Sequence, residues 1–423
     1  MRKHVSRDLT GHAASDPKPA RIIDLSRLIR RTGRRPTGVD RVELAYLRFV
    51  IGRAEPAFGL VRTRLGYVLL DRAGLRDLLA RFTGAQEWGP ADRLARAMRI
   101  DPGQRRAESD LRRLCTARCL PSGLKRMLRR NLPRGAVYYN VGHSNLTRRV
   151  LRALKDGAQA SIVVFLHDTI PLDHPQYQRP ESEPRLRKIL HQVSVHADLL
   201  LCNSEATRTN LIRHLGAEGR VPPVYAAHLG VDLDCSENGN NATVPHISAP
   251  YFLCLGTIEP RKNHAFLLDL WDRMAAERGV EDLPHLVICG RRGWCAPAFF
   301  ERLDSNPLRG RVIHEFGGLS DGAVRGLLRN ARGLLFPSLA EGFGLPPVEA
   351  AALGIPVICN DLPVLREILG DIPIYATVSD SYLWERKIRD LTEETRSRSG
   401  PCSRTGFSAP RWEDHFKTVL SVT

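Results

Sequence analysis

The feature that most constrains the fold is an alternation of short apolar runs with longer segments of helical periodicity. Segments such as 39–50 and 263–278 place apolar residues at helical spacing. The short runs between such segments are residues 21–26, 136–140, 161–166, 198–202, 251–255, 285–289, 333–336 and 356–359. Short strands separated by helices are typical of parallel sheets with crossover helices. The sequence therefore predicts an α/β protein with Rossmann-like, doubly wound sheets.

A polar segment rich in Gly and Asn, beginning at Cys235, interrupts this alternation. The chain has 423 residues, too many for one ordinary domain. We therefore predict two domains facing a cleft, with flanking segments that complete the chain. The predicted parts are a disordered tail (1–20), an N-terminal domain (21–235), a linker (236–248), a C-terminal domain (249–405) and a C-terminal segment that crosses back to the first domain (406–423).

The cysteine pattern and hydropathy indicate the compartment. The nine cysteines are an odd number, scattered, and several lie inside apolar runs, where a free thiol behaves as a small hydrophobic group. No apolar run is long enough to span a membrane, and the first 20 residues lack the apolar core of a secretory signal. We predict a reduced, cytoplasmic protein.

Charge is distributed unevenly between the two halves. The net charge is +17, and the excess of Lys and Arg lies in residues 1–240, whereas residues 241–423 are close to balance. Such an asymmetry favours an anionic partner for the first half. No aromatic-interleaved basic motif supports nucleic acid as that partner.

Residues 105–134 contain the densest basic stretch. A helix there would place three apolar residues on one side and four cations on the other: Leu124, Met127 and Leu128 against Lys125, Arg126, Arg129 and Arg130. One interpretation is an amphipathic helix on an anionic membrane, which would put the protein on the inner face of the cytoplasmic membrane. The other is an ordinary basic surface helix.

The stretch from Glu341 to Glu349 has the features of a ligand loop. A strand ends before it and a helix starts near Pro346, so backbone N–H groups and the positive end of a helix dipole are available to a phosphorylated ligand. Gly342 and Gly344 allow close backbone approach. The two carboxylates suit sugar and ribose hydroxyls. Taken alone, such a pair more often consists of two solvated glutamates in a plain strand–loop–helix connection, because this spacing is common by chance.

A second candidate loop follows the strand that ends at Gly256. Arg261 and Lys262 stand just before a helix, where adjacent cations can hold a diphosphate, and Asn263 is a candidate helix cap. The alternative is a solvated cation pair beside a helix start.

Together these motifs resemble glycosyltransferase family four, the retaining enzymes with the GT-B fold. The resemblance rests on Gly256-Thr-Ile-Glu-Pro-Arg-Lys-Asn263, Cys289-Gly-Arg-Arg-Gly-Trp294 and Pro337-Ser-Leu-Ala-Glu-Gly-Phe-Gly-Leu-Pro-Pro-Val-Glu-Ala350, and it covers residues 250–375 strongly. One departure is Thr257, where many relatives have a basic residue.

The resemblance implies roles for particular residues. Arg261 and Lys262 would hold the donor diphosphate, and Glu341 would bind the sugar hydroxyls. Glu349 would bind the nucleotide ribose. Backbone groups of Gly256, Phe343, Gly344 and Leu345 would complete the donor site.

The first half resembles the family more weakly. His167 follows a strand and resembles the family's active-site histidine, with Asp168 fixing its tautomer or contacting the acceptor. Gly38 resembles the family's first glycine loop. Taken alone, the His-Asp pair favours a structural role and Gly38 an ordinary turn. The triplet Asp232-Leu-Asp234 looks like a turn, and we expect no metal or other cofactor.

The predicted function is transfer of a hexose, with retention, from a nucleoside diphosphate sugar, a mannosyl donor being favoured. The predicted acceptor is a glycan or lipid-linked intermediate in surface polysaccharide or glycolipid synthesis. Two alternatives remain open: a non-catalytic protein that binds anionic glycans or membranes, and a nucleotide-sugar epimerase of the same fold.

Overall fold

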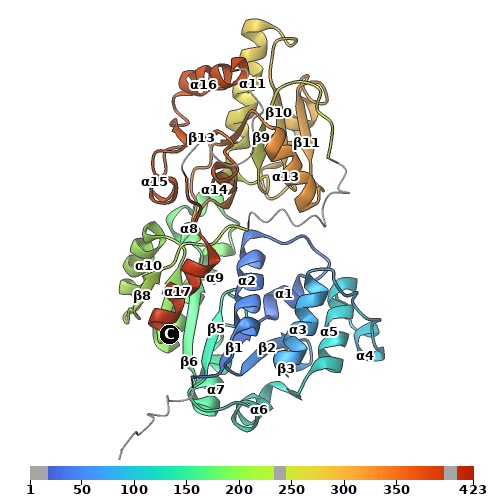
Figure 1. The fold of residues 1–423 in the computed structure, drawn as a ribbon, viewed down its shortest axis with the longest axis vertical. Helices are drawn as coiled ribbons and strands as arrows, with labels where there is room; N and C mark the ends of the chain where they lie inside the picture. The colour runs from blue at the N-terminus through green and yellow to red at the C-terminus, as the bar shows by residue number, and fades with distance from the viewer. Residues whose placement is uncertain (1–17, 233–243, 395–406) are drawn as a thin grey trace, which may run out of the picture.

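The structure is a computed structural model that describes residues 18–232, 244–394 and 407–423, and it contains two sheet-centred domains (Figure 1). The N-terminal sheet has eight strands in the order β4-β3-β2-β1-β5-β6-β7-β8. They are β1 (Arg21–Asp24), β2 (Ala57–Thr63), β3 (Gly66–Leu70), β4 (Ala117–Cys119), β5 (Val137–Asn140), β6 (Ser161–Leu166), β7 (Leu199–Cys202) and β8 (Val224–Ala226). All neighbours pair in parallel except β2 with β3 and β3 with β4.

The C-terminal sheet has six strands, all parallel, in the order β11-β10-β9-β12-β13-β14. They are β9 (Tyr251–Leu255), β10 (His285–Cys289), β11 (Ile313–Phe316), β12 (Gly333–Phe336), β13 (Val357–Cys359) and β14 (Ile374–Tyr375). The predicted fold class is confirmed, because both predicted sets of apolar runs form parallel strands.

Helices connect the strands in both domains. The N-terminal domain contains α1 (Ser26–Arg30), α2 (Gly38–Gly52), α3 (Arg72–Phe82), α4 (Arg93–Arg96), α5 (Pro102–Leu114), η1 (Pro121–Gly123), α6 (Leu124–Asn131), α7 (Arg148–Ala158), α8 (Ile170–Asp173), η2 (Pro175–Tyr177), α9 (Ser182–His196) and α10 (Glu205–Glu218). The C-terminal region contains η4 (Pro260–Lys262), α11 (His264–Arg278), α12 (Pro297–Ser305), α13 (Asp321–Asn330), α14 (Leu345–Ala352), α15 (Pro363–Leu369), α16 (Ser381–Glu393) and α17 (Trp412–Val422). None of these helices has the length and apolarity needed to cross a bilayer.

Helix α17 lies against the N-terminal domain (Figure 1). Its His415 Nε2 lies 3.0 Å from the Tyr46 hydroxyl, and its Phe416 ring stacks on Phe49 with ring centroids 4.0 Å apart. The last residues of the chain are thereby tied to the first domain by apolar and polar contacts. Residues 1–17, most of the predicted linker and residue 406 lie outside the described residues.

The structure corrects the prediction of a membrane-lying apolar face in residues 105–134. These residues form α5, β4, η1 and α6 rather than one helix. Leu124, Met127 and Leu128 are buried in the core of the N-terminal domain, beneath α7. Burial within the protein removes these side chains from any lipid contact, so α6 presents only its cations outward.

The two domains contact each other where the carboxyl ends of their strands meet. Ser204 Oγ, before α10, donates to the carbonyl oxygen of Gly342 at 2.9 Å. Glu367 of α15 accepts hydrogen bonds from the backbone N–H groups of Glu205 and Ala206 at 2.7 and 3.0 Å, and it pairs with His228 at 2.9 Å. A carboxylate of the C-terminal domain therefore caps a helix of the N-terminal domain. This contact holds the strand edges of the two domains facing each other.

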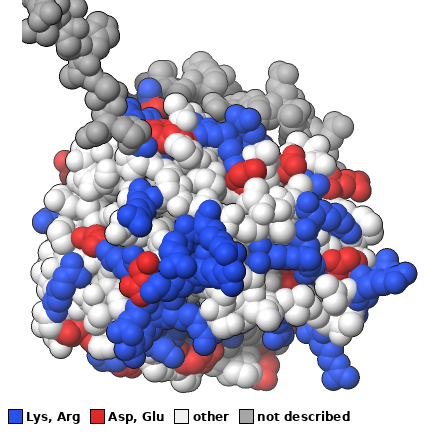
Figure 2. Space-filling view, turned by 90° about the horizontal axis from the view of Figure 1, so that it is seen from below, with Lys and Arg blue, Asp and Glu red and all other residues white. Residues whose placement is uncertain are grey.

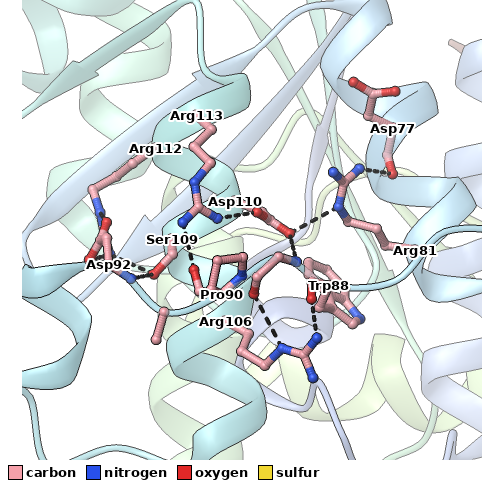
Figure 3. Close-up of polar contacts among 12 residues, drawn as sticks. Asp77, Arg81, Trp88, Pro90, Asp92, Arg106, Ser109, Asp110, Arg112 and Arg113 are labelled. Atoms are coloured by element: carbon pink, nitrogen blue, oxygen red, sulfur yellow. Dashed lines mark hydrogen bonds and ion pairs between the residues drawn. The ribbon is translucent and has the colours of Figure 1, made fainter.

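An ionic network holds the long connection between α3 and α5 (Figure 3). Asp110 accepts from Arg81 Nε at 3.0 Å, from the Gly89 N–H at 2.8 Å and from Arg113 Nη1 at 2.5 Å. Arg112 donates two hydrogen bonds to the carboxylate of Asp92, from Nε at 2.7 Å and from Nη2 at 2.8 Å. The connection has little regular structure, so these charge-assisted bonds are its main attachment.

We predict that Asp110→Asn destabilises the protein by about 3 kcal/mol, because the change leaves Arg81 without its buried carboxylate. Urea unfolding measures the effect. The control is Asp77→Asn, whose exposed side chain takes no part in this network. Equal stability of the two variants would contradict the assigned role of Asp110.

Candidate functional site

Glu341 forms a buried ion cluster with Arg261 and Lys262. Its Oε1 lies 2.8 Å from Arg261 Nη1 and 2.6 Å from Lys262 Nζ. The loop after β12 supplies the glutamate and the turn after β9 supplies the cations, because neighbouring strands of a parallel sheet end at one edge. Burial opposes ionisation of Glu341, but the charges of Arg261 and Lys262 outweigh it and lower its pKa to about 2.

The two cations have different environments. Burial would lower the pKa of Arg261, but Glu341 and Glu259 raise it overall, and Arg261 Nε lies 2.5 Å from Glu259. The pKa of Lys262 is lowered by burial and by the neighbouring Arg261, against the attraction of Glu341. Its ammonium group lies over the Phe336 ring, 4.5 Å from the centroid. The site thus holds two cations, Arg261 and Lys262, next to two carboxylates, Glu259 and Glu341.

Gly256 makes space for this lysine. Its φ is +138°, and a Cβ atom there would lie 3.3 Å from Lys262 Cε. Asn263 does not act as predicted: it adopts a left-handed conformation before α11, and its side chain makes no cap hydrogen bond. The sharp η4 turn, rather than a side-chain cap, therefore connects the cation pair to α11.

The start of α14 presents backbone groups beside Glu341. Gly344 takes the N-cap position with φ +90°, and no side chain caps the helix. Phe343 is buried, and its ring lies beside that of His228, with ring centroids 6.2 Å apart. An uncapped helix start next to two cations is suited to an anionic ligand.

Glu349 lies one turn into α14 and contacts the other domain. Its Oε1 is 2.6 Å from Arg41 Nη1 of α2. Burial raises the pKa of Glu349, and Arg41 counteracts this effect. A Cβ atom on Gly38 would lie 3.4 Å from Leu345, so the glycine loop packs directly on the start of α14. Arg41 was missed from the sequence, although it follows Gly38 in the same motif.

His167 lies at the end of β6 and is almost fully buried. Its Nε2 is 2.7 Å from the Val141 carbonyl oxygen, and burial lowers its pKa to about 4. A carbonyl oxygen can only accept, so Nε2 carries the proton and Nδ1 a lone pair. The ring is neutral at pH 7.

His143 is a second histidine, half-buried beside the first, that the sequence did not single out. Its ring centroid lies 5.1 Å from that of His167, and its Nε2 is 2.9 Å from the Phe165 carbonyl oxygen. Burial and the neighbouring His167 lower its pKa to about 3. His143 follows β5, and β5 neighbours β6, the strand that leads to His167. The sequence could not show that the two histidines are close, because it does not give the strand order.

Of the two roles predicted for Asp168, the structure does not support the first, in which it fixes the tautomer of His167; the second, contact with the acceptor, stays a prediction. Its Oδ1 accepts from the Ile170 N–H at 3.1 Å, whereas the Val141 carbonyl orients the histidine. Burial raises the pKa of Asp168, and the charge of Arg261 across the cleft counteracts it. A Cβ atom on Gly342 would lie 2.4 Å from the His167 carbonyl oxygen and 2.9 Å from Asp168 Cβ. Only glycine therefore permits this approach of the domains.

The structure brings the predicted residues of both domains to one interdomain region. No group of three or more His, Cys, Asp or Glu side chains that could hold a metal occurs within residues 18–232, 244–394 and 407–423. Asp232 makes only a distant contact of 3.9 Å with Arg48, and Asp234 lies outside the described residues. The region can bind an anion through Arg261, Lys262 and the α14 start, and hydroxyl groups through Glu341, Glu349 and His167.

Comparison with known proteins finds similarity to glycosyltransferases. Residues 244–399 match the family of glycosyl transferases group 1. The chain is 33% identical over 225 residues to the serotype-specific mannosyltransferase WbdA of Escherichia coli, which covers 50% of this chain and 27% of that protein. It is 28% identical to the O-antigen chain mannosyltransferase B of Escherichia coli, over 52% of this chain and 58% of that protein. The matched region thus spans less than two thirds of either relative.

The whole fold also has a structural counterpart. The crystal structure of Anabaena HepE in complex with UDP-glucose superposes with a TM-score of 0.56 at 15% identity, covering 88% of this chain and 90% of that one. At this identity the likeness concerns the fold, and it supports the two-domain GT-B arrangement.

The buried neutral histidines predict a pH dependence of stability. The folded pKa values of His143 and His167, about 3 and 4, lie below the ordinary value of 6.5. Below pH 6.5 these histidines bind protons in the unfolded chain but stay neutral in the folded protein. The free energy of unfolding therefore falls as the pH is lowered, until the folded pKa is reached. Each histidine contributes about 1.4 kcal/mol per pH unit over this window.

Urea unfolding between pH 7 and pH 4.5 measures this slope. His143→Gln is expected to reduce it by about one proton. An unaltered slope in His143→Gln would show that His143 is not held neutral.

Proposed function

We propose that this chain, whose C-terminal domain belongs to the glycosyl transferases group 1 family, is a retaining glycosyltransferase. It transfers a hexose, with a mannosyl donor favoured, from a nucleoside diphosphate sugar to a glycan or lipid-linked acceptor in surface polysaccharide or glycolipid synthesis. The observation that carries the proposal is the cluster of Arg261, Lys262 and Glu341 at the start of α14.

The cations and the carboxylates bind different parts of the donor. Arg261 and Lys262 hold the diphosphate, together with the backbone of Gly256, Phe343, Gly344 and Leu345 at the start of α14. Glu349 binds the ribose hydroxyls, which requires it to exchange its bond with Arg41. Glu341 turns from the cations to the sugar hydroxyls once the diphosphate neutralises those cations.

Charge stabilisation at the leaving group drives the reaction. As the bond to the diphosphate breaks, the sugar gains oxocarbenium character and the diphosphate gains negative charge. Arg261 and Lys262 lie where that charge develops, in a buried site where electrostatic interactions are strong. No metal is needed in this scheme, because the cations and the helix start take its role.

His167 positions the sugar. Its Nδ1 lone pair accepts a hydrogen bond from a sugar hydroxyl, while its Nε2 proton is held by Val141. The depressed pKa keeps the ring in this neutral form. Asp168 and the Gly38 loop lie on the acceptor side of the same cleft and exclude water when the domains close.

Exposed arginines on the N-terminal domain suit an anionic membrane surface. Figure 2 shows a large cluster of Lys and Arg side chains on the end of the molecule where α6 and α7 lie. The exposed arginines of this region are Arg126, Arg129, Arg130, Arg134, Arg148, Arg149 and Arg152. In the part of the chain that the structure describes, no carboxylate pairs with any of them, so their charge is available to lipid headgroups. The protein would act in the cytoplasm, peripherally on the membrane.

We expect Glu341→Gln to lower the rate of mannosyl transfer by roughly 100-fold or more, because the neutral amide loses the charged contact to the sugar. Release of nucleoside diphosphate from a nucleoside diphosphate mannose measures the rate. The matched control is Glu301→Gln, an exposed glutamate on α12. Full activity in Glu341→Gln would refute the role assigned to Glu341, whereas no release of nucleoside diphosphate by the wild type would favour a non-catalytic carbohydrate- or membrane-binding protein.

The membrane proposal has its own test. Arg126→Gln with Arg129→Gln should weaken sedimentation with vesicles that contain anionic phospholipid by about thirtyfold, since each of the two cations near the surface contributes about 1 kcal/mol. Vesicles of neutral phospholipid should bind neither protein. A control double variant, Arg76→Gln with Arg386→Gln, removes the same charge from other exposed positions. Equal binding of both variants would exclude this face as the docking surface.

A further inference from the structure

Two exposed leucines lie on neighbouring turns at one edge of the N-terminal sheet. Leu65, with Arg64, forms the tight turn between β2 and β3, and it is 42% exposed. Leu120 follows β4, the edge strand, and at 69% it is the most exposed leucine among the described residues. β3 pairs with β4 so that Tyr67 lies opposite Cys119, which places the turn next to Leu120. Leu65 and Leu120 are called the leucine tip below.

Short hydrogen-bonded turns hold both leucines in place. Gly66 has a φ of +145°, and a Cβ atom there would lie 3.1 Å from Leu120 Cα, so glycine lets the first turn lie directly against the second. The Thr63 hydroxyl accepts from the Leu65 N–H and donates to the Gly66 carbonyl oxygen, each at 3.3 Å. The Leu120 carbonyl oxygen accepts from the Gly123 N–H at 2.9 Å. The two side chains therefore protrude from a bonded part of the fold rather than from a long loop.

Exposed cations adjoin the leucine tip. Arg62 and Arg64 lie at the end of β2 and in the turn, and Arg118 lies on β4. Within the part of the chain that the structure describes, no carboxylate lies within 4.0 Å of these three arginines. From Leu120 the chain continues through η1 into α6, which packs against β4 and carries the exposed Arg126. Figure 2 views this end of the molecule, where Lys and Arg side chains gather.

The combination of protruding leucines and unpaired cations matches a lipid bilayer with anionic headgroups. A single exposed leucine is ordinary on a protein surface and needs no partner. Two leucines are too few for the apolar core of a protein–protein interface. A nucleic acid would be held by the cations alone and would gain nothing from the leucines. At a bilayer, leucines can enter the boundary of the acyl chains while the arginines remain with the phosphates.

We propose that the leucine tip inserts into the surface of an anionic phospholipid bilayer, beside the arginines of α6. The proposal rests on the membrane attachment in the function above, and it supplies the apolar element of that attachment. The apolar side of α6 is buried in the core, so α6 by itself contributes only charge. Burial of leucine in lipid does not depend on ionic strength in the way that charge attraction does, so the tip keeps part of the binding when salt screens the arginines. It also turns the β3–β4 edge of the sheet toward the lipid.

Sedimentation of the full chain with vesicles of anionic phospholipid tests the leucine tip. Leu65→Ser and Leu120→Ser should each weaken binding by about tenfold, the effect expected when about half of a leucine side chain is buried in lipid. This loss should be the same at low and at high salt, whereas the loss in Arg126→Gln with Arg129→Gln should shrink as salt rises. Leu120→Trp should bind more tightly than wild type, because tryptophan favours the membrane interface. A gain of binding cannot result from misfolding.

The matched control is Leu94→Ser on α4. Leu94 is 54% exposed and has the exposed Arg93 and Arg96 beside it, so the change removes an equivalent side chain from another basic part of the same domain. Leu94→Ser should bind anionic vesicles as wild type does. A normal melting temperature shows that each variant is folded, and nucleoside diphosphate affinity in solution should be the same in all of them.

Two results would overturn the leucine tip and leave the arginine patch of the proposed function intact: equal vesicle binding by wild type, Leu65→Ser and Leu120→Ser, or an equal loss in Leu94→Ser. Absence of wild-type binding to anionic vesicles would overturn the tip together with the membrane attachment. The glycosyltransferase proposal fails separately, by absence of nucleoside diphosphate binding in the wild type, and the vesicle measurement is unaffected by that result.

Discussion

The buried contact of Glu341 with Arg261 and Lys262 is the interaction on which the rest of the site depends. Two cations approach the same carboxylate oxygen, and Glu259 pairs with Arg261 from the other side. A buried charge is tolerated only when it is paired, so these four side chains hold one another in place. In the proposed function, a donor diphosphate would replace the carboxylates as the partner of these cations, which would free Glu341 without leaving an uncompensated cation.

The interdomain contacts extend this arrangement. Gly342 follows Glu341 directly, and it touches the His167 carbonyl while its own carbonyl accepts from Ser204. Arg41 reaches from α2 to Glu349, and Glu367 caps α10. The loop after β12 and the helices α14 and α15 are therefore linked to the N-terminal domain by both backbone and side-chain contacts. Binding of a nucleotide at Glu349 would exchange one of these contacts, which couples occupancy to the relative position of the domains.

The N-terminal domain carries a patch of exposed positive charge. Within the described residues no carboxylate pairs with the arginines on α6 and α7, which suits a diffuse anionic surface. In the proposed function these arginines would hold the protein near its acceptor.

The sequence alone determined the fold class and most residues of the proposed donor site, because the strand ends and the loop motifs that follow them are local. The runs around β9 and β12, Gly342, Gly344 and the Arg261–Lys262 pair were all visible as short patterns. Only the tertiary structure decided the partners that come from distant segments. It buried the apolar side of α6 in the core, showed that Val141 rather than Asp168 hydrogen-bonds His167, and brought His143 next to His167 and Arg41 next to Glu349. The physical reason is that strand order and domain contact, which no local pattern encodes, decide which strand ends become neighbours.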